Sequence, residues 1–264
     1  MNKTEQPEIA EIIDIKDEAK DIRTFTFKYQ MNAKPGQFFV LWLPGVDEKP
    51  FGVSYQDDEK FKATICKVGP FTEKVFELKK KDKVGIRGPY GTFFKLYGKN
   101  IALVAGGYGI APLSFLADAA IKKGINVNFI SGARTKELLV SCEKDSKICS
   151  VFYTTDDGSY GDKGYTTDKL RKVLETQKID CIYTVGPEIM MKKVVEMSDE
   201  FDVDCQLSLE RYMKCGFGIC GQCVVDDLGI RMCKEGPVID KKLAKMIKEF
   251  GKYKRDSSGK KVEF

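Results

Sequence analysis

Four cysteines near the end of the chain constrain its fold most strongly. Cys215, Cys220, Cys223 and Cys233 follow one another in the pattern C-x4-C-x2-C-x9-C. This spacing is typical of loops that hold a [2Fe–2S] cluster, in which two irons share four thiolate ligands. Three glycines among the first three cysteines allow the loop to bend, and they let backbone N–H groups approach the sulfurs. A zinc site, which usually shows two C-x2-C pairs or Cys/His mixtures, and plain core cysteines are the weaker alternatives.

The composition limits the remaining chemistry. The 264 residues include no histidine, which excludes Rieske ligation, His-containing zinc sites and nucleophile systems built on Ser-His-Asp or Cys-His. Nine cysteines without a secretory context indicate reduced thiols. No apolar stretch follows residues 1–5 or reaches the length needed to span a bilayer, so we expect a cytoplasmic protein without a membrane partner. The five cysteines outside the motif are expected to be small buried side chains: Cys66, Cys142, Cys149, Cys181 and Cys205.

The net charge of +5 is concentrated at the C-terminus. Residues 240–264 carry eight Lys and one Arg against four acids, while the rest of the chain is balanced. Basic residues are not interleaved with aromatic ones across a domain, so no nucleic-acid partner is expected. The tail is predicted to be a solvated helix with its extension, or else a docking surface for an acidic partner.

The hydrophobic pattern changes along the chain and divides it into three regions. Residues 1–98 show alternating or continuous apolar runs broken by turns, with one helix at 72–80, which predicts an antiparallel β-barrel. Residues 99–204 alternate strands with helices, which predicts a parallel α/β sheet. Residues 205–264 hold the cysteine loop and the basic tail. The expected strands of the second region are 101–105, 125–130, 148–154 and 181–185, and its expected helices are 111–123, 136–141, 166–175 and 187–201.

A glycine-rich turn follows the first strand of the second region. Gly106, Gly107 and Gly109 lie between that strand and a helix whose first turn holds Pro112. Such a turn lets a pyrophosphate approach the backbone at a helix N-terminus, which carries unpaired N–H groups. The string is not a full G-x-G-x-x-G, and Ser131 stands where a ribose-binding acid is usual, so an ordinary structural turn remains the alternative.

Two short segments of the barrel region offer a second phosphate site. Residues 49–54 begin with Lys49 and open a strand, and residues 68–72 lead into the helix at Thr72. A cation and small residues beside a helix N-terminus can hold a pyrophosphate. By pattern alone, these segments and the Gly88–Gly91 stretch are better interpreted as ordinary turns.

The order of these pieces resembles the ferredoxin-NADP reductase superfamily, and most closely the family of electron-transfer subunits of type B dihydroorotate dehydrogenases. The similarity covers nearly the whole chain, from the Pro35-Gly36 turn to Gly236-Pro237 after the last cysteine. The cluster motif behind a flavin and nicotinamide module is its specific part. The resemblance implies FAD on the β-barrel, NAD at the α/β domain and [2Fe–2S] near the C-terminus.

Site residues follow from this resemblance by position. Lys49 occupies the position of the Arg in the family's Arg-Pro-x-Ser motif, so the bidentate phosphate contact of a guanidinium is lost. Gly52 occupies the position of the Ser, so a hydroxyl donor is lost. The expected FAD contacts are Lys49, Pro50, Phe51, Gly52, Ile65, Cys66, Lys67, Phe71 and Thr72, the expected NAD contacts are Gly106, Gly107, Gly109 and Pro112, and the expected metal ligands are Cys215, Cys220, Cys223 and Cys233.

The resemblance also implies the activity. By this resemblance, electrons are expected to pass from a separate FMN-containing dihydroorotate dehydrogenase catalytic subunit, in a heterotetramer, through [2Fe–2S] and FAD to NAD⁺ in pyrimidine biosynthesis. Since no acid/base cluster is evident, we expect no catalytic residue for substrate oxidation in this chain. The positive charge of Arg134 leaves NADP as an alternative nucleotide to NAD. Two alternative functions remain open. The chain could be the small subunit of an NADH-dependent ferredoxin:NADP oxidoreductase or of a sulfhydrogenase, or it could be a redox-sensing module without turnover.

Overall fold

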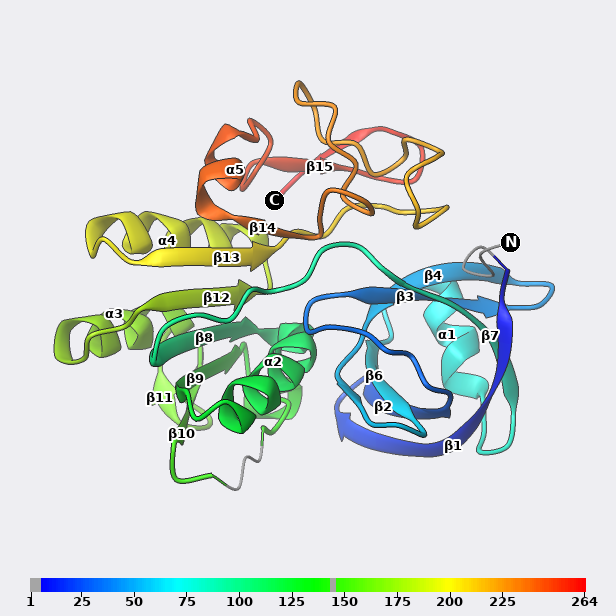
Figure 1. The fold of residues 1–264 in the computed structure, drawn as a ribbon, viewed down its shortest axis with the longest axis horizontal. Helices are drawn as coiled ribbons and strands as arrows, with labels where there is room; N and C mark the ends of the chain where they lie inside the picture. Colours follow the sequence, from blue (N-terminus) through cyan, green and yellow to red (C-terminus); the bar gives the residue numbers. More distant parts are fainter. Residues whose placement is uncertain (1–5, 143–145) are drawn as a thin grey trace.

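The computed structural model describes residues 6–142 and 146–264. Two seven-stranded sheets lie next to each other, and the C-terminal part of the chain packs along one side of both (Figure 1). The N-terminal residues 1–5 considered above lie outside the described residues. No helix in the described part of the chain is long and apolar enough to cross a membrane.

The first sheet is the predicted antiparallel barrel. Its strand order is β4-β3-β7-β1-β2-β6-β5, and the edge strands β4 and β5 are separated by two residues of chain, so the sheet curls to bring its edges together. Phe25, Phe27, Phe39 and Phe61 fill its core, with the rings of Phe39 and Phe61 4.8 Å apart. The elements are β1 (Glu8–Ala19), β2 (Ile22–Lys28), β3 (Phe38–Leu43), β4 (Asp47–Gly52), β5 (Tyr55–Gln56), β6 (Phe61–Cys66), α1 (Pro70–Glu77) and β7 (Lys83–Tyr90).

The second sheet confirms the predicted α/β region and adds a strand to it. Its order is β11-β10-β9-β8-β12-β13-β14, parallel throughout except for β14, which returns from the C-terminal region and pairs antiparallel with β13. Helix α2 packs on one face of the sheet, and α3 and α4 pack on the other. The elements are β8 (Asn100–Gly106), α2 (Ile110–Lys122), β9 (Asn126–Ala133), β10 (Cys149–Thr155), β11 (Asp162–Lys163), α3 (Thr166–Thr176), β12 (Cys181–Val185), α4 (Glu188–Glu200), β13 (Asp204–Ser208) and β14 (Val238–Asp240).

The helix predicted at 136–141 is wrong. A single 3₁₀ turn, η3 (Lys136–Leu138), stands there, and the chain then runs extended. Val140 and Cys142 are buried against the α2 side of the sheet, and the Tyr153 hydroxyl bonds both to the Cys142 N–H, at 2.8 Å, and to its carbonyl, at 3.1 Å. Burial of alternate residues therefore favours an extended strap over a helix at this edge.

The basic tail is also more structured than the predicted solvated helix. After α5 (Lys241–Met246) it forms a hairpin of β15 (Tyr253–Arg255) and β16 (Lys261–Glu263). The Asp226 carboxylate accepts two bonds from the Arg255 guanidinium, at 3.0 and 2.9 Å, and one from the Tyr253 hydroxyl, at 2.8 Å. Lys245 and Lys248 pair with Asp199 and Asp227. Much of the tail's positive charge is thus balanced by acids of the same chain.

Of the two region boundaries predicted from the sequence, one falls in a connection between the sheets and the other falls inside a strand. The one at 98/99 lies between β7 and β8, in the connection between the sheets. The one at 204/205 lies inside β13, the last parallel strand of the second sheet. The division into three regions stays a prediction.

Replacing Asp226 should loosen the tail hairpin. In Asp226→Asn the side chain loses the charge that holds Arg255, so we expect amide exchange in β15 and β16 to become roughly tenfold faster, in line with the loss of a charge-assisted hydrogen bond. Hydrogen exchange followed by mass spectrometry measures this. Asp227→Asn, which removes an exposed pair with Lys248, is the control and should leave the hairpin unchanged.

The same contact sets a pH dependence. The Arg255 guanidinium holds the pKa of Asp226 below its ordinary value of 3.8. Its contribution to hairpin stability is therefore fully present above about pH 3.8 and is lost as the pH falls through the lower pKa of the folded state. Protection of the β15 amides in the wild type, taken relative to the intrinsic exchange rate at each pH, that did not fall on acidification would contradict this account.

A candidate cofactor cleft and cluster loop

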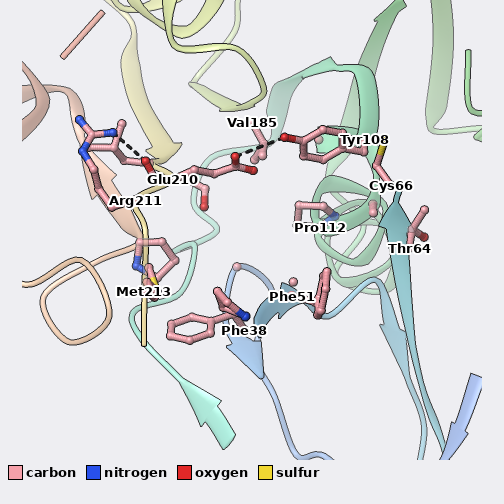
Figure 2. A pocket seen from close by; sticks show the side chains of 18 of the residues that line it. Phe38, Phe51, Thr64, Cys66, Tyr108, Pro112, Val185, Glu210, Arg211 and Met213 are labelled. Atoms are coloured by element: carbon pink, nitrogen blue, oxygen red, sulfur yellow. Dashed lines mark hydrogen bonds between the residues drawn. The ribbon is translucent and has the colours of Figure 1, made fainter. Parts of the chain in front are cut away.

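A cleft with an empty volume of about 1070 Å³ opens where the two sheets meet (Figure 2). The barrel contributes Pro50, Phe51 and Gly52 from the β4 side and Thr64 and Cys66 from β6. The second sheet contributes residues from the turn after β8 and Val185 at the end of β12. Parts of two segments that were predicted separately as phosphate sites, residues 50–52 and residues 108, 109, 111 and 112, thus face one shared space, whereas the predicted NAD contacts Gly106 and Gly107 do not line it.

The cleft continues into a second hollow with an empty volume of about 1120 Å³. The two share Pro50, Phe51 and Thr72, and the second adds Lys49 and the start of helix α1 at Gly69–Phe71. The rings of Phe51 and Phe71 stack with centroids 6.2 Å apart. A helix N-terminus and a lysine beside it make this end of the cleft suited to an anion. The opposite wall is the tail hairpin, through Lys254, Arg255, Asp256 and Ser257.

The residues expected to contact FAD do not all reach this space. Seven of the nine line one or both parts of the cleft: Lys49, Pro50, Phe51, Gly52, Cys66, Phe71 and Thr72. The Ile65 side chain is fully buried in the barrel core, and Lys67 pairs with Asp21 at 2.7 Å away from the cleft. The Thr72 hydroxyl accepts bonds from the N–H groups of Val68 and Gly69, at 2.8 and 3.0 Å, so it shapes the loop before α1.

The glycines after β8 have two distinct roles. A Cβ on Gly109 would lie 2.3 Å from the Val185 carbonyl, and one on Gly106 would lie 2.6 Å from Pro187. These two glycines allow the turn to pack on the end of β12. Gly107, by contrast, has φ +55° and open space around it, so its backbone is the part of the turn that a phosphate can approach. Pro112 lies 3.8 Å from the Cβ position of Gly52 and joins this turn to the barrel.

Sequence reasoning missed the segment between β13 and the cysteine loop. Residues 208–211 and 213 line the cleft, and the Tyr108 hydroxyl donates to the Glu210 carboxylate at 3.4 Å (Figure 2). The Glu210 side chain is exposed to the cleft, where desolvation by the neighbouring protein raises its pKa and Lys254 opposes that rise. No motif marks these residues; their closeness to Cys215 in sequence was the available signal.

Arg211 is the buried centre of this segment. Its side chain is 3% exposed and pairs with Glu188, at the start of α4, and with Glu249 of the tail, at 2.6 Å. Burial raises the pKa of Glu188, while Arg211 opposes the shift. Glu249 in turn accepts the Asp226 N–H at 2.9 Å, and Glu188 accepts the Gly251 N–H at 3.1 Å. Arg211 Nη2 has no hydrogen-bond partner within residues 6–142 and 146–264.

The four cysteines of the motif lie together as two pairs. The Cys220 N–H donates to Cys215 Sγ at 3.5 Å, and the Cys233 N–H donates to Cys223 Sγ at 3.3 Å. Despite partial burial, backbone N–H groups of Cys220, Ile219 and Phe217 lower the pKa of Cys215 to about 6. In the described part of the chain, no three or more His, Cys, Asp or Glu side chains converge as the ligands of one metal ion. Two pairs of thiols fit two irons better than a single zinc.

The loop glycines take the predicted left-handed conformations. Gly216, Gly218 and Gly221 have φ of +83°, +90° and +72°. Of the five other cysteines, Cys142, Cys181 and Cys205 are buried as expected, whereas Cys66 and Cys149 are partly exposed. The expectation of burial is wrong for both: Cys66 stands at the end of β6, where the barrel opens onto the cleft, and Cys149 is the first residue of β10.

Comparison with known proteins agrees with this arrangement. Residues 210–243 match the family model described as the iron-sulfur cluster binding domain of dihydroorotate dehydrogenase B, and residues 103–196 match the oxidoreductase NAD-binding domain. A Methanocaldococcus jannaschii protein named probable dihydroorotate dehydrogenase B (NAD(+)), electron transfer subunit, is 50% identical over 98% of this chain and 100% of its own. A Methanothermobacter thermautotrophicus protein of the same name is 42% identical over 99% of each chain.

Solved structures show the same fold. A chain from an NADH-dependent reduced ferredoxin-NADP oxidoreductase superposes with a TM-score of 0.81 at 32% identity, covering 89% of each chain. Phthalate dioxygenase reductase, at 18% identity and a TM-score of 0.62, covers 74% of this chain and 64% of its own, and supports the fold alone.

Removal of the buried guanidinium should be costly. In Arg211→Met, Glu188 and Glu249 would remain buried without a cation, so we expect the free energy of unfolding to fall by about 3–5 kcal/mol. Denaturant titration of the purified protein measures this. The control is Arg171→Met, which breaks an exposed pair with Glu200 and should cost at most about 1 kcal/mol. Equal losses in the two variants would mean that burial of Arg211 is not decisive.

Proposed function

The chain belongs to the family of electron transfer subunits of dihydroorotate dehydrogenase B, and we propose that its shared cleft and its cysteine loop hold the redox groups of that function. It is the oxidoreductase subunit that passes electrons from the catalytic subunit, through [2Fe–2S] and FAD, to NAD⁺ in pyrimidine biosynthesis. Bound flavin supplies the exchange between one-electron and two-electron steps that links a cluster to nicotinamide.

One observation supports this assignment above the others. Residues 50–52 of the flavin segment, residues 108, 109, 111 and 112 of the nucleotide turn, and residues 208–211 and 213 line the same cleft, and Met213 stands two residues before the first cluster cysteine. The sites inferred for three redox groups are therefore adjacent, as direct transfer between them requires.

We assign the barrel side and the α1 end of the cleft to FAD. Lys49 offers a point charge near the helix start, and its Nζ lies 6.0 Å from the centre of the Phe71 ring and 5.6 Å from that of Tyr212. Gly52 provides no hydroxyl, so the α1 N-terminus and Lys49 would carry the phosphate contacts. Of the nine residues expected from sequence, Ile65 and Lys67 are the weakest assignments because their side chains lie elsewhere.

We assign the turn at Gly106, Gly107 and Gly109, with Pro112, to NAD. Gly107 has the open surroundings that a pyrophosphate needs, and its two glycine neighbours position the turn. The pairs Cys215/Cys220 and Cys223/Cys233 are the proposed ligands of the two irons.

The catalytic partner is implied by the family, and we propose an FMN-containing dihydroorotate dehydrogenase subunit in a heterotetramer. The cluster loop is the natural contact, because Ile219 is 78% exposed and Cys220 beside it is exposed. A cytoplasmic location is proposed from nine cysteines that form no disulfide among the described residues. The chain has no histidine, which fits substrate oxidation in the partner.

Anaerobic purification of the tagged subunit from its native cell tests the function. We expect a dihydroorotate-oxidising partner to copurify, and the complex to reduce NAD⁺ with dihydroorotate. Cys220→Ser should abolish that coupled reaction and change iron and sulfide content, while NADH-driven reduction of ferricyanide through the flavin persists. A hydrogenase or a glutamate-synthase-like partner instead would reject the proposal, and absence of all turnover would favour a sensor.

A separate prediction concerns the nucleotide turn. Gly107→Asp places a negative charge in open space where phosphates are expected, and Asp tolerates the left-handed region, so NADH affinity should fall more than about tenfold from like-charge repulsion. Titration of the flavin-loaded subunit with NADH measures this.

The matched control for this variant is Gly124→Asp. Gly124 also has a positive φ, +71°, and open surroundings, but it lies after α2, away from the cleft. Its variant should bind NADH normally, and both variants should retain the wild-type ratio of FAD to protein. Unchanged NADH affinity in Gly107→Asp would move the nucleotide site elsewhere.

A further inference from the structure

Arg87 is a buried cation that joins the barrel to the cluster loop. It lies in β7, its side chain is 4% exposed, and its guanidinium is bound at both ends. One end, Nε and Nη2, donates to the Glu48 carboxylate of β4 at 3.1 and 2.5 Å. The other end, Nη1, donates to the backbone carbonyl of Cys215 at 3.0 Å and contacts the Tyr90 hydroxyl at 3.3 Å.

Aromatic packing encloses the same contact. The guanidinium carbon lies 5.8 Å from the ring centres of both Tyr90 and Phe217, and those two rings are 6.3 Å apart. A Cβ on Gly216 would lie 3.2 Å from Val40 and 3.3 Å from Tyr90, so the loop lies directly on the barrel here. The first turn of the cluster loop is therefore held against β3 and β7, and β3 pairs directly with β4, which lines the cleft.

The charge of Arg87 is not symmetrically neutralised. Glu48 is 32% exposed and binds the edge of the guanidinium remote from Cys215, so water screens the carboxylate more than it screens the arginine. Of the two charged groups, the Arg87 guanidinium is therefore closer to the cluster loop and less exposed to water than the Glu48 carboxylate. A positive charge close to an iron–sulfur centre favours its reduced form, because reduction adds negative charge.

We propose that Arg87 is a positioning residue for electron transfer: it fixes the Cys215 end of the cluster loop on the flavin barrel, and with Glu48 it sets the reduction potential of the cluster. This rests on the proposed function. No motif pointed to Arg87, which precedes the Gly88–Gly91 stretch in sequence and reaches Cys215 through the tertiary fold alone.

Redox titration of the anaerobic complex, followed by electron paramagnetic resonance of the cluster, tests the proposal through the signs of two shifts. Arg87→Met should shift the cluster potential to more negative values, and Glu48→Gln should shift it to more positive values. The double variant should lie between the two single variants and remain more negative than the wild type, because the arginine is the nearer and less screened of the two charges. A purely structural role would disturb both single variants in the same direction or leave the potential unchanged, and either outcome would overturn the proposal.

Two further variants separate charge from geometry. Arg87→Lys keeps the charge but loses the fork, so the potential should stay near the wild-type value while amide exchange at residues 215–219 becomes faster. Arg231→Met is the matched control, because Arg231 also donates to a loop carbonyl, that of Gly218 at 2.9 Å, but is 41% exposed. Its shift should be smaller than that of Arg87→Met, since water screens it; an equal shift would refute the argument from burial.

The proposal can still be tested if one variant does not assemble the cluster. Should Arg87→Met fail to load iron, Glu48→Gln decides alone, and an unshifted potential in it overturns the proposal. Absence of iron, sulfide and a resonance signal in the wild-type complex would reject the proposed function itself, which distinguishes the two failures.

Discussion

A buried arginine bound by two carboxylates holds together the parts of the molecule on which the cleft depends. Arg211 joins the start of α4 through Glu188, the tail through Glu249 and, by way of Glu249, the backbone of Asp226, which lies between the third and fourth cysteines of the motif. Burying three charges costs desolvation energy, and their attraction offsets it only when the geometry is good. Such a network selects one arrangement of the parts more than it adds to the free energy of unfolding. It fixes how the α/β sheet, the tail and the segment 208–213 meet, and these parts line the cleft together with the barrel.

The tail gains its structure from this network. Asp226 binds Arg255 and Tyr253, so the hairpin of β15 and β16 is tied to the same region that Glu249 reaches. The hairpin then supplies the wall of the cleft opposite the start of α1. A sequence with many lysines and little apolar content reads as a solvated extension, but ion pairs with Asp199, Asp226 and Asp227 fold it onto the body of the protein.

The two buried arginines act at opposite sides of the cluster loop. Arg211 stands four residues before Cys215 and connects that segment to the α/β side, whereas Arg87 binds the Cys215 carbonyl from the barrel side. Met213, which lies between Arg211 and Cys215 in the sequence, lines the cleft. The loop that is assigned to the cluster is thus fixed both to the barrel and to the α/β sheet, the regions proposed to bind flavin and nucleotide, an arrangement suited to electron transfer over a constant distance.

The sequence by itself determined the local chemistry: the cysteine spacing, the barrel and α/β patterns, and the glycine turn, because each depends on residues close together in the chain. It could not show that residues 50–52 and 108–112 meet at one cleft, that Ile65 and Lys67 point away from it, or that the chain at 136–141 forms a single 3₁₀ turn followed by an extended strap, because these follow from packing between distant segments. Only the tertiary structure brought Arg87 to Cys215 across 128 residues and Arg211 to Glu188 and Glu249. Charges find buried partners through the topology of the sheets, and no local pattern in the chain encodes that pairing.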